Sequence, residues 1–211
     1  MMRRKFRLVL IAVPFIILGV VGFVYFRHIS STRVLTVSFK NAKNVRVVDV
    51  SGAQAGVTEK EIARIQKSGD SVRIQKELTV FVRYDGAPGY ADGFENGASD
   101  TVVINPEYSK EKIKMILKEN REALSQAVFS NIQNGSSYVL AEGTLRDHGT
   151  WYISTLTPTE DQAGDSDTDI LKVLIKKDGD SWQLVGTPKL VFTKYNTKDI
   201  PIPVLDAVNA Y

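Results

Sequence analysis

Residues 8–26 read Leu-Val-Leu-Ile-Ala-Val-Pro-Phe-Ile-Ile-Leu-Gly-Val-Val-Gly-Phe-Val-Tyr-Phe, with no charged side chain and almost none that forms hydrogen bonds. A helix that rises ~1.5 Å per residue spans about 28 Å over this length, close to the ~30 Å hydrocarbon core of a bilayer. Four basic residues precede it (Arg3, Arg4, Lys5, Arg7), and residues 27–33 offer no site typical of signal-peptide cleavage. The stretch therefore predicts an uncleaved, single-pass transmembrane helix in the lipid bilayer of a cell membrane. Residues 1–7 are expected in the cytoplasm and the rest of the chain outside it.

The composition of the chain narrows the class of protein. Of 211 residues, 43% are hydrophobic and 24% are charged, which is ordinary for a globular chain. The net charge of +3 comes from the N-terminal basic cluster, because residues 27–211 hold 23 basic and 24 acidic side chains. A near-neutral body does not favour nucleic acid as a partner. The chain has no cysteine, which excludes disulfides, thiolate metal sites and cysteine nucleophiles and favours a bacterial envelope.

Residues 27–105 form the first exported domain in this prediction. Short β-branched runs at 34–39, 45–50, 61–65, 71–74, 78–84 and 101–104 alternate apolar and polar residues and are separated by turn sequences. This pattern predicts a small antiparallel β-sandwich. The residues expected to face its core are Leu35, Val37, Phe39, Val47, Ile62, Ile65, Val72, Ile74, Val80 and Val82.

Turn positions in the same region carry a resemblance to a known family. Gly-Val-Thr at 56–58, Ser-Gly-Asp-Ser-Val-Arg-Ile at 68–74, a strand that ends at Tyr84, and Gly-Tyr at 89–90 make residues 34–105 similar to the PEGA-type surface module. The resemblance implies a β-sandwich that serves as a spacer or faces carbohydrate or protein in an envelope. The segments at 181–190, 200–203 and 208–209 resemble uncharacterised single-span surface proteins of ultrasmall, host-attached bacteria, which implies an envelope location.

Residues 86–97 hold four glycines and two aromatic residues, Tyr90 and Phe94. No Gly-Lys-Ser/Thr sequence closes the stretch and a strand follows it, so a phosphate-binding loop is not favoured. Two interpretations stay open: a long hairpin loop with no other role, and a partner-binding loop in which Tyr90 and Phe94 contact a protein or glycan.

Residues 106–211 form the second exported domain in this prediction. Ser109 suits a helix N-cap, and apolar residues then recur at helical spacing until Asn134-Gly135, which predicts one helix of about 24 residues. Strands are expected at 138–142, 151–156, 170–175, 182–185 and 189–193, with a hairpin turn at 178–180 and a short helix at 203–210. A long helix packed on an antiparallel meander sheet is the layout of cystatin-like and NTF2-like folds. The predicted fold class is α+β with an N-terminal transmembrane helix.

Residues that could carry chemistry are few. Of the two histidines, His148 is expected in a hairpin turn, and no motif of a nucleophilic or metal-dependent enzyme occurs. Asp165, Asp167 and Asp169 have the spacing of a calcium loop, but Ile170 and Lys176 stand where such a loop has Gly and Glu. We therefore expect no metal and no cofactor, with these three aspartates as the only candidate ligands.

The sequence predicts a membrane-anchored, extracytoplasmic binding or scaffold protein with a protein or glycan partner. One alternative is an envelope enzyme that acts on cell-wall or surface polymers through carboxylates such as Asp161 or Glu142. Such an enzyme needs two carboxyl groups held ~5–10 Å apart in a cleft. The other alternative is a subunit of a secretion or conjugation apparatus.

Overall fold

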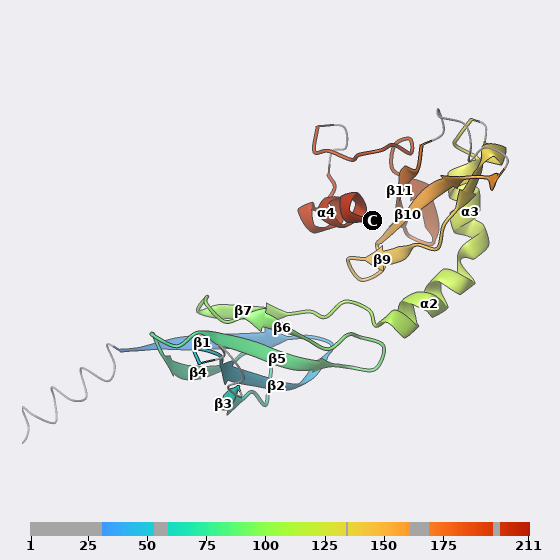
Figure 1. Ribbon diagram of the computed structural model, residues 1–211. Coiled ribbons are helices and arrows are strands. Elements are labelled where there is room, and N and C mark those ends of the chain that lie inside the picture. Colours follow the sequence, from blue (N-terminus) through green and yellow to red (C-terminus); the bar gives the residue numbers. More distant parts are fainter. Residues whose placement is uncertain (1–30, 53–58, 134, 161–168, 196–198) are drawn as a thin grey trace, which may run out of the picture. The chain divides into compact units, whose positions relative to one another are not determined.

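The computed structural model of the protein describes residues 31–52, 59–133, 135–160, 169–195 and 199–211. Two compact units divide these residues: the first takes the described residues up to 86 together with 92–105, and the second takes 87–91 and those from 106 onward. The first unit is built of strands, and the second combines a sheet with short helices (Figure 1). Each unit has its own hydrophobic core.

The first unit consists of two sheets. Its strands are β1 (Thr32–Phe39), β2 (Ala42–Asp49), β3 (Lys60–Arg64), β4 (Asp70–Gln75), β5 (Val80–Gly86), β6 (Gly93–Asn96) and β7 (Thr101–Ile104). One sheet has the order β4-β1-β7 and the other β3-β2-β5-β6. The second sheet is antiparallel throughout, whereas β1 and β7 are parallel. The unit therefore departs from a wholly antiparallel arrangement at one strand pair.

The two sheets share one core. Alternate residues of each strand point inward, as the period of two requires. The core comprises Leu35, Val37, Val45, Val47, Ile65, Ile74, Val80, Val82, Val102 and Ile104, all buried. Phe39, Ile62 and Val72, which we expected in the core, are half-buried and pack against it. β6 lies within the stretch that the sequence predicted to be a loop, and it pairs with β5.

The second unit contains one sheet and three short α-helices. Its elements are α2 (Lys110–Glu119), α3 (Arg121–Phe129), the 3-10 helix η1 (Gly135–Ser137), β8 (Tyr138–Leu140), β9 (Thr144–Arg146), β10 (Trp151–Pro158), β11 (Leu171–Asp178), β12 (Ser181–Leu184) and α4 (Ile202–Ala210). The sheet order is β12-β11-β10-β8, and β9 pairs with β10 on the same side as β8. The predicted hairpin turn at 178–180 and the closing helix are confirmed.

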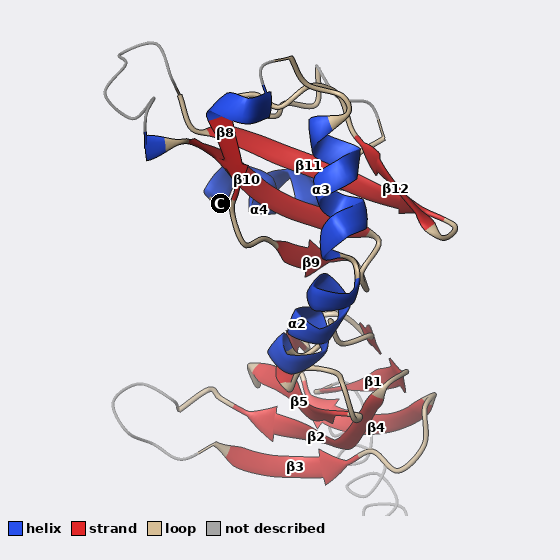
Figure 2. Cartoon of the chain, turned by 90° about the vertical axis from the view of Figure 1, so that its right-hand side faces the viewer, coloured by secondary structure: helices blue, strands red, loops and turns tan. Residues whose placement is uncertain are grey.

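Helices cover both faces of this sheet (Figure 2). Tyr152 and Leu156 of β10 belong to the cluster that packs with α3, while Trp151 and Ile153 belong to the cluster that packs with α4. Side chains of successive β10 residues thus point to opposite faces of the sheet, and both faces are buried. The strand predicted at 189–193 does not form. Instead, the Asn209 side chain donates to the Phe192 carbonyl oxygen (2.7 Å) and accepts from its N–H (3.0 Å).

The single long helix of the prediction is wrong, because the chain breaks it at Asn120. Ser109 caps α2 as predicted. Asn120, however, leaves helical geometry (φ −104°, ψ 8°), and its side-chain amide donates to the Ile116 carbonyl oxygen over 2.8 Å. Its amide oxygen accepts from Trp182 Nε1 at 3.0 Å. An asparagine that bonds both its own backbone and a neighbouring strand ends one helix and starts the next.

The predicted fold class is also corrected. The described part of the chain is mostly β-sheet, and none of its helices is long and apolar enough to cross a membrane. Its α-helices have nine or ten residues, whereas a bilayer requires ~20. The transmembrane helix and the single-pass class of the prediction therefore have no counterpart among the described helices. Residues 8–26, where that helix was expected, lie outside the described residues.

Candidate functional site

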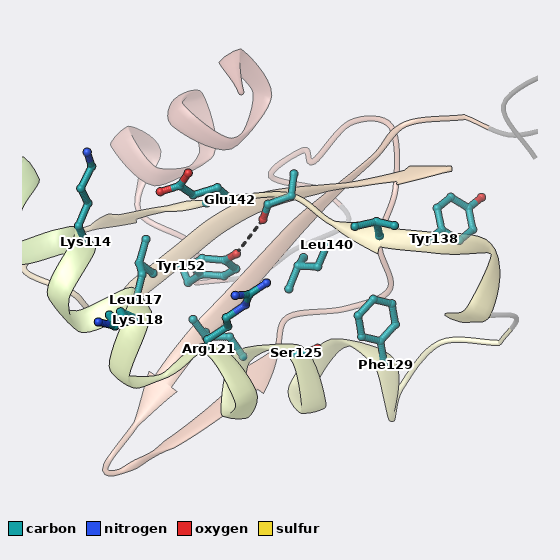
Figure 3. A pocket seen from close by; sticks show the side chains of 14 residues that line it. Lys114, Leu117, Lys118, Arg121, Ser125, Phe129, Tyr138, Leu140, Glu142 and Tyr152 are labelled. Atoms are coloured by element: carbon teal, nitrogen blue, oxygen red, sulfur yellow. Dashed lines mark hydrogen bonds between the residues drawn. The ribbon is translucent and has the colours of Figure 1, made fainter. Parts of the chain in front are cut away.

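A cleft opens where the helices leave part of the sheet uncovered. On one face of the second unit, α3 packs against β12 and β11 and α2 contacts β9. The area beside β8 is the part of this face that the helices do not fill. A cleft of about 570 Å³ lies there, lined by α2 and α3 on one side and by residues 138–143 on the other (Figure 3).

One end of the cleft is basic. Lys114, Lys118 and Arg121 line it, and all three are exposed. Lys114 and Lys118, four residues apart, lie on one side of α2, and Arg121 is the first residue of α3. Figure 3 shows Arg121 reaching from the start of α3 into the cleft. These three cations outnumber Glu142, the one carboxylate that lines the cleft, so this end keeps a net positive charge for a ligand that enters here.

The other end of the cleft is apolar. Phe129 at the end of α3 and Tyr138 at the start of β8 line it, and both are half-buried. Leu140 lies between this end and the basic end (Figure 3). Tyr138, Leu140 and Phe129 also pack against the core of the unit, so they are held in place before any ligand arrives. The cleft therefore has a basic end and an apolar end, which could contact different parts of one ligand.

Tyr152 lines the inner part of the cleft and is 4% exposed. Its hydroxyl donates a hydrogen bond to the Ala141 carbonyl oxygen at 3.3 Å. Burial raises the pKa of the Tyr152 hydroxyl above its ordinary value of about 10.0, and the nearby Tyr211 and Glu142 add to the effect. The group is therefore a neutral donor at physiological pH.

The segment between β8 and β9 is fixed by two close contacts. The fully buried Ser154 donates its hydroxyl to the Ala141 carbonyl oxygen at 2.7 Å. A Cβ atom at Gly143 would lie 2.4 Å from both the Ile153 carbonyl oxygen and the Tyr152 ring. Only glycine fits at this position. The rim of the cleft is therefore held to β10 by backbone proximity and hydrogen bonds.

The cleft suits binding better than acid–base catalysis. Glu142 is the only carboxylate among its lining residues, which include no histidine, and it is exposed. The two-carboxylate arrangement of the enzyme alternative is therefore not assembled there by described residues. Asp161, the other carboxylate of that alternative, lies outside the described residues.

The calcium prediction is left open. Asp165 and Asp167 fall outside the described residues, and Asp169 is described and exposed. The parts of the chain that are described contain no group of three or more His, Cys, Asp or Glu side chains that could hold a metal ion.

Tyr90, one of the two residues of the predicted partner-binding loop, contacts its own chain in the second unit. Its ring meets Tyr108 edge-on at 5.5 Å. Lys112 Nζ lies 4.5 Å from the Tyr90 ring centroid and 3.8 Å from that of Tyr108. A cation shared by two tyrosines attaches residues 87–91 to the start of α2. This set of contacts explains Tyr90 without a partner.

Phe94, the other residue of that loop, belongs to the first unit. It lies on β6, is exposed, and meets Phe81 edge-on at 5.1 Å. The Arg83 guanidinium lies 5.3 Å from its ring centroid and also pairs with Glu59, which lowers the pKa of that carboxyl. Tyr90 and Phe94 thus fall in different units, and the partner-binding role predicted for them stays a prediction.

His148 lies in the turn between β9 and β10, as the sequence predicted. Asp147, His148 and Gly149 all have positive φ (50°, 54° and 82°). The backbone N–H groups of Asp147 and His148 donate to the Glu107 carboxylate over 3.1 and 2.9 Å. Successive N–H groups in such a turn form a concave anion site, which here is filled by a side chain of the same unit.

Sequence reasoning missed the residues that line the cleft. Lys114, Lys118 and Arg121 were not among the predicted site residues. A signal was present, because these three cations recur at a spacing of four and then three residues. Tyr152 and Phe129 carried no such signal, since any aromatic residue on a buried strand or helix reads as core.

Comparisons of the chain with models of protein families, with curated proteins and with solved structures gave no match. The resemblance of residues 34–105 to a PEGA-type module stays a prediction.

Proposed function

We propose that this protein is a binding protein, and that the cleft of the second unit takes a ligand that combines negative charge with an apolar group. The observation that carries the proposal is the pairing, within one cleft of about 570 Å³, of a basic end with an aromatic end. Arg121 and Lys118 would meet the charge, and Phe129 and Tyr138 would pack on the apolar group. Pockets that bury a ligand commonly combine apolar walls with a few placed polar groups.

The proposal agrees with the chemistry of the lining residues. A single exposed carboxylate and a neutral buried tyrosine provide no pair of groups for general acid–base catalysis. The same residues are sufficient for recognition, because charge attracts the ligand and the packed aromatic side chains need not rearrange.

The test uses anilinonaphthalene sulfonate, a fluorescent probe with an apolar ring system and one negative charge. We expect one saturable site on the full chain, with NMR shifts confined to residues near Ser125, Leu140 and Tyr152. Arg121→Glu should weaken binding about tenfold, because an attractive charge becomes a repulsive one. Arg73→Glu, on exposed β4 of the first unit, is the matched control and should have little effect. Equal binding by both variants, or NMR shifts away from the cleft, would contradict the proposal.

A further inference from the structure

β8 is the outer strand of its sheet. In the sheet order β12-β11-β10-β8, β10 is its one neighbour among the described strands. The Ala141 N–H donates to the Thr155 carbonyl oxygen, and the Thr159 N–H donates to the Ser137 carbonyl oxygen, both over 2.9 Å. Odd-numbered residues of this segment therefore bond to β10. Because backbone groups alternate along an antiparallel strand, those of Tyr138 and Leu140 point away from the sheet.

From this edge and the cleft beside it, we propose that an extended peptide segment of a protein partner adds to β8 as a further antiparallel strand, with an acidic and an aromatic side chain directed toward α3. This inference rests on the proposed function, and it names the ligand of that cleft. Recognition by strand addition takes its affinity from the backbone and its specificity from pockets for alternate side chains.

The spacing of the two side chains follows from the geometry of α3. Arg121 and Phe129 are eight residues apart, and a helix rises ~1.5 Å per residue, so they lie about 12 Å apart along its axis. A strand advances ~3.3 Å per residue, so four residues cover about 13 Å. Positions four apart also face the same side of a strand. The peptide should therefore carry its acidic and aromatic residues at positions i and i+4.

The order of these residues follows from the direction of β8. Figure 3 shows Arg121 toward the Glu142 end of the strand segment and Phe129 toward the Tyr138 end. A strand antiparallel to β8 runs from the Glu142 end to the Tyr138 end. The acidic residue therefore precedes the aromatic one. Intervening apolar side chains would face the other side of the sheet, where Val139 is 54% exposed.

The lining of the cleft favours a peptide over a glycan. The cleft is flanked by six consecutive residues, 138–143, the first three of which form β8, the outer strand of the sheet. Such an edge offers donors and acceptors at the repeat of a peptide chain. An anionic sugar could use the basic end, but it has no group that fits the aromatic end and the strand repeat together.

The experiment measures fluorescence anisotropy with the full chain and a labelled heptapeptide, Thr-Glu-Val-Thr-Val-Phe-Thr, blocked at both ends. The reversed sequence, Thr-Phe-Val-Thr-Val-Glu-Thr, has the same composition and is the matched control. We expect the reversed peptide to bind about tenfold more weakly, because its charge and its ring meet the wrong ends of the cleft. Lysine in place of glutamate should also weaken binding about tenfold, and Arg121→Glu should reverse this preference.

Two N-methylated forms of the peptide test strand addition itself. One is methylated on the Glu, central Thr and Phe residues, and the other on the two Val residues. In a strand, alternate N–H groups face the neighbour, so one form should lose binding at least about tenfold and the other should retain it. Equal effects of the two forms, or none, would overturn strand addition.

Parallel titration with anilinonaphthalene sulfonate separates the two proposals. Binding of the probe without binding of the peptide overturns the inference and leaves the proposed function standing. Failure of both overturns both. Displacement of the probe by an oligogalacturonate but not by the peptide would assign the cleft to a glycan. Dimerisation of the chain through β8, detected by sedimentation and lost in Leu140→Pro, would assign the edge to a second copy.

Discussion

The two units bury their sheets in different ways. In the first, two sheets cover each other across one core, and residues such as Leu35 and Val82 are fully buried from opposite sides. In the second, one sheet is covered on each face by short helices. Four strands side by side are about 19 Å wide, whereas a helix with its side chains is about 10 Å wide. A single helix such as α3 cannot cover that face.

This difference explains why the cleft lies in the second unit. α3 has nine residues, about 13 Å in length, and it packs toward β12 and β11. The area beside β8 is then left to the side chains that line the cleft. A sheet matched by another sheet leaves less of its inner face unpaired. The contrast suggests variants that act on one unit and spare the other.

The largest expected effect is that of Gly143→Ala. The added Cβ would lie 2.4 Å from the Ile153 carbonyl oxygen and from the Tyr152 ring. Both residues belong to β10, so neither contact can be relieved without disturbing that strand. We expect a loss of about 3 kcal/mol in the free energy of unfolding of the second unit. Urea denaturation followed by tryptophan fluorescence reports on this unit, since both tryptophans, Trp151 and Trp182, belong to it.

Gly97→Ala is the matched substitution in the first unit. Its Cβ would lie 2.6 Å from Val80 Cγ2 and 2.9 Å from the Val80 carbonyl oxygen. Amide hydrogen exchange, read on peptides from each unit, should show Gly143→Ala loosening the second unit and Gly97→Ala the first. If each variant loosened both units equally, the two would not be separate in stability, and the comparison would fail.

Much of the strand pattern followed from the sequence. Apolar residues that recur at every second position, such as Leu35 and Val37 or Val80 and Val82, predict a strand. In a strand, alternate side chains point to the same face and can all be buried there. β6 was missed because Gly93 and the exposed Phe94 lie in a glycine-rich stretch whose composition is typical of a loop. The parallel pairing of β1 and β7 was also missed, because the two strands are far apart in the sequence and no local pattern encodes their pairing.

The candidate site was beyond sequence reasoning for a related reason. Its residues come from α2, α3, β8 and β10, which only the packed sheet brings together. The break at Asn120 decides where α3 lies, and it depends on a hydrogen bond from Trp182, 62 positions later in the chain. Helical periodicity runs through Asn120 without interruption, so the pattern predicted one helix. The contact with Trp182, which the local pattern does not contain, accounts for the break.

Asn120→Ala tests this account and should have an intermediate effect. The substitution leaves Trp182 Nε1 without its acceptor, and Trp182 is 8% exposed. We expect a loss of about 1.5 kcal/mol, because the Trp182 N–H loses its acceptor and the Ile116 carbonyl oxygen loses a side-chain donor. The change should appear in urea denaturation and should weaken probe binding, because α3 loses its anchor to β12.

Asn131→Ala is the control for that substitution. Asn131 also donates its side-chain amide to a helix carbonyl oxygen, that of Ala127 at 2.9 Å, but it is exposed. Its loss should cost about 0.5 kcal/mol and leave probe binding unchanged. Equal effects of the two alanine variants would show that the Trp182 contact does not set the position of α3.

Tyr152→Phe should have the smallest effect at neutral pH and a distinct signature at high pH. Losing the 3.3 Å bond to the Ala141 carbonyl oxygen should cost about 0.5 kcal/mol.

Burial raises the pKa of Tyr152 in the folded chain, so the unfolded chain loses this proton first as pH rises. The stability that the neutral hydroxyl maintains is therefore present below its ordinary pKa of about 10.0, and it is lost as pH rises from there through the folded pKa. Measured by tryptophan fluorescence, the decline above pH ~10 should be shallower in Tyr152→Phe than in the unaltered chain. Tyr211→Phe, which removes a tyrosine of raised pKa that is 47% exposed, should flatten the decline less. Identical pH profiles for the unaltered chain and Tyr152→Phe would mean that this tyrosine is not desolvated, and that the cleft is open to water as far as β10.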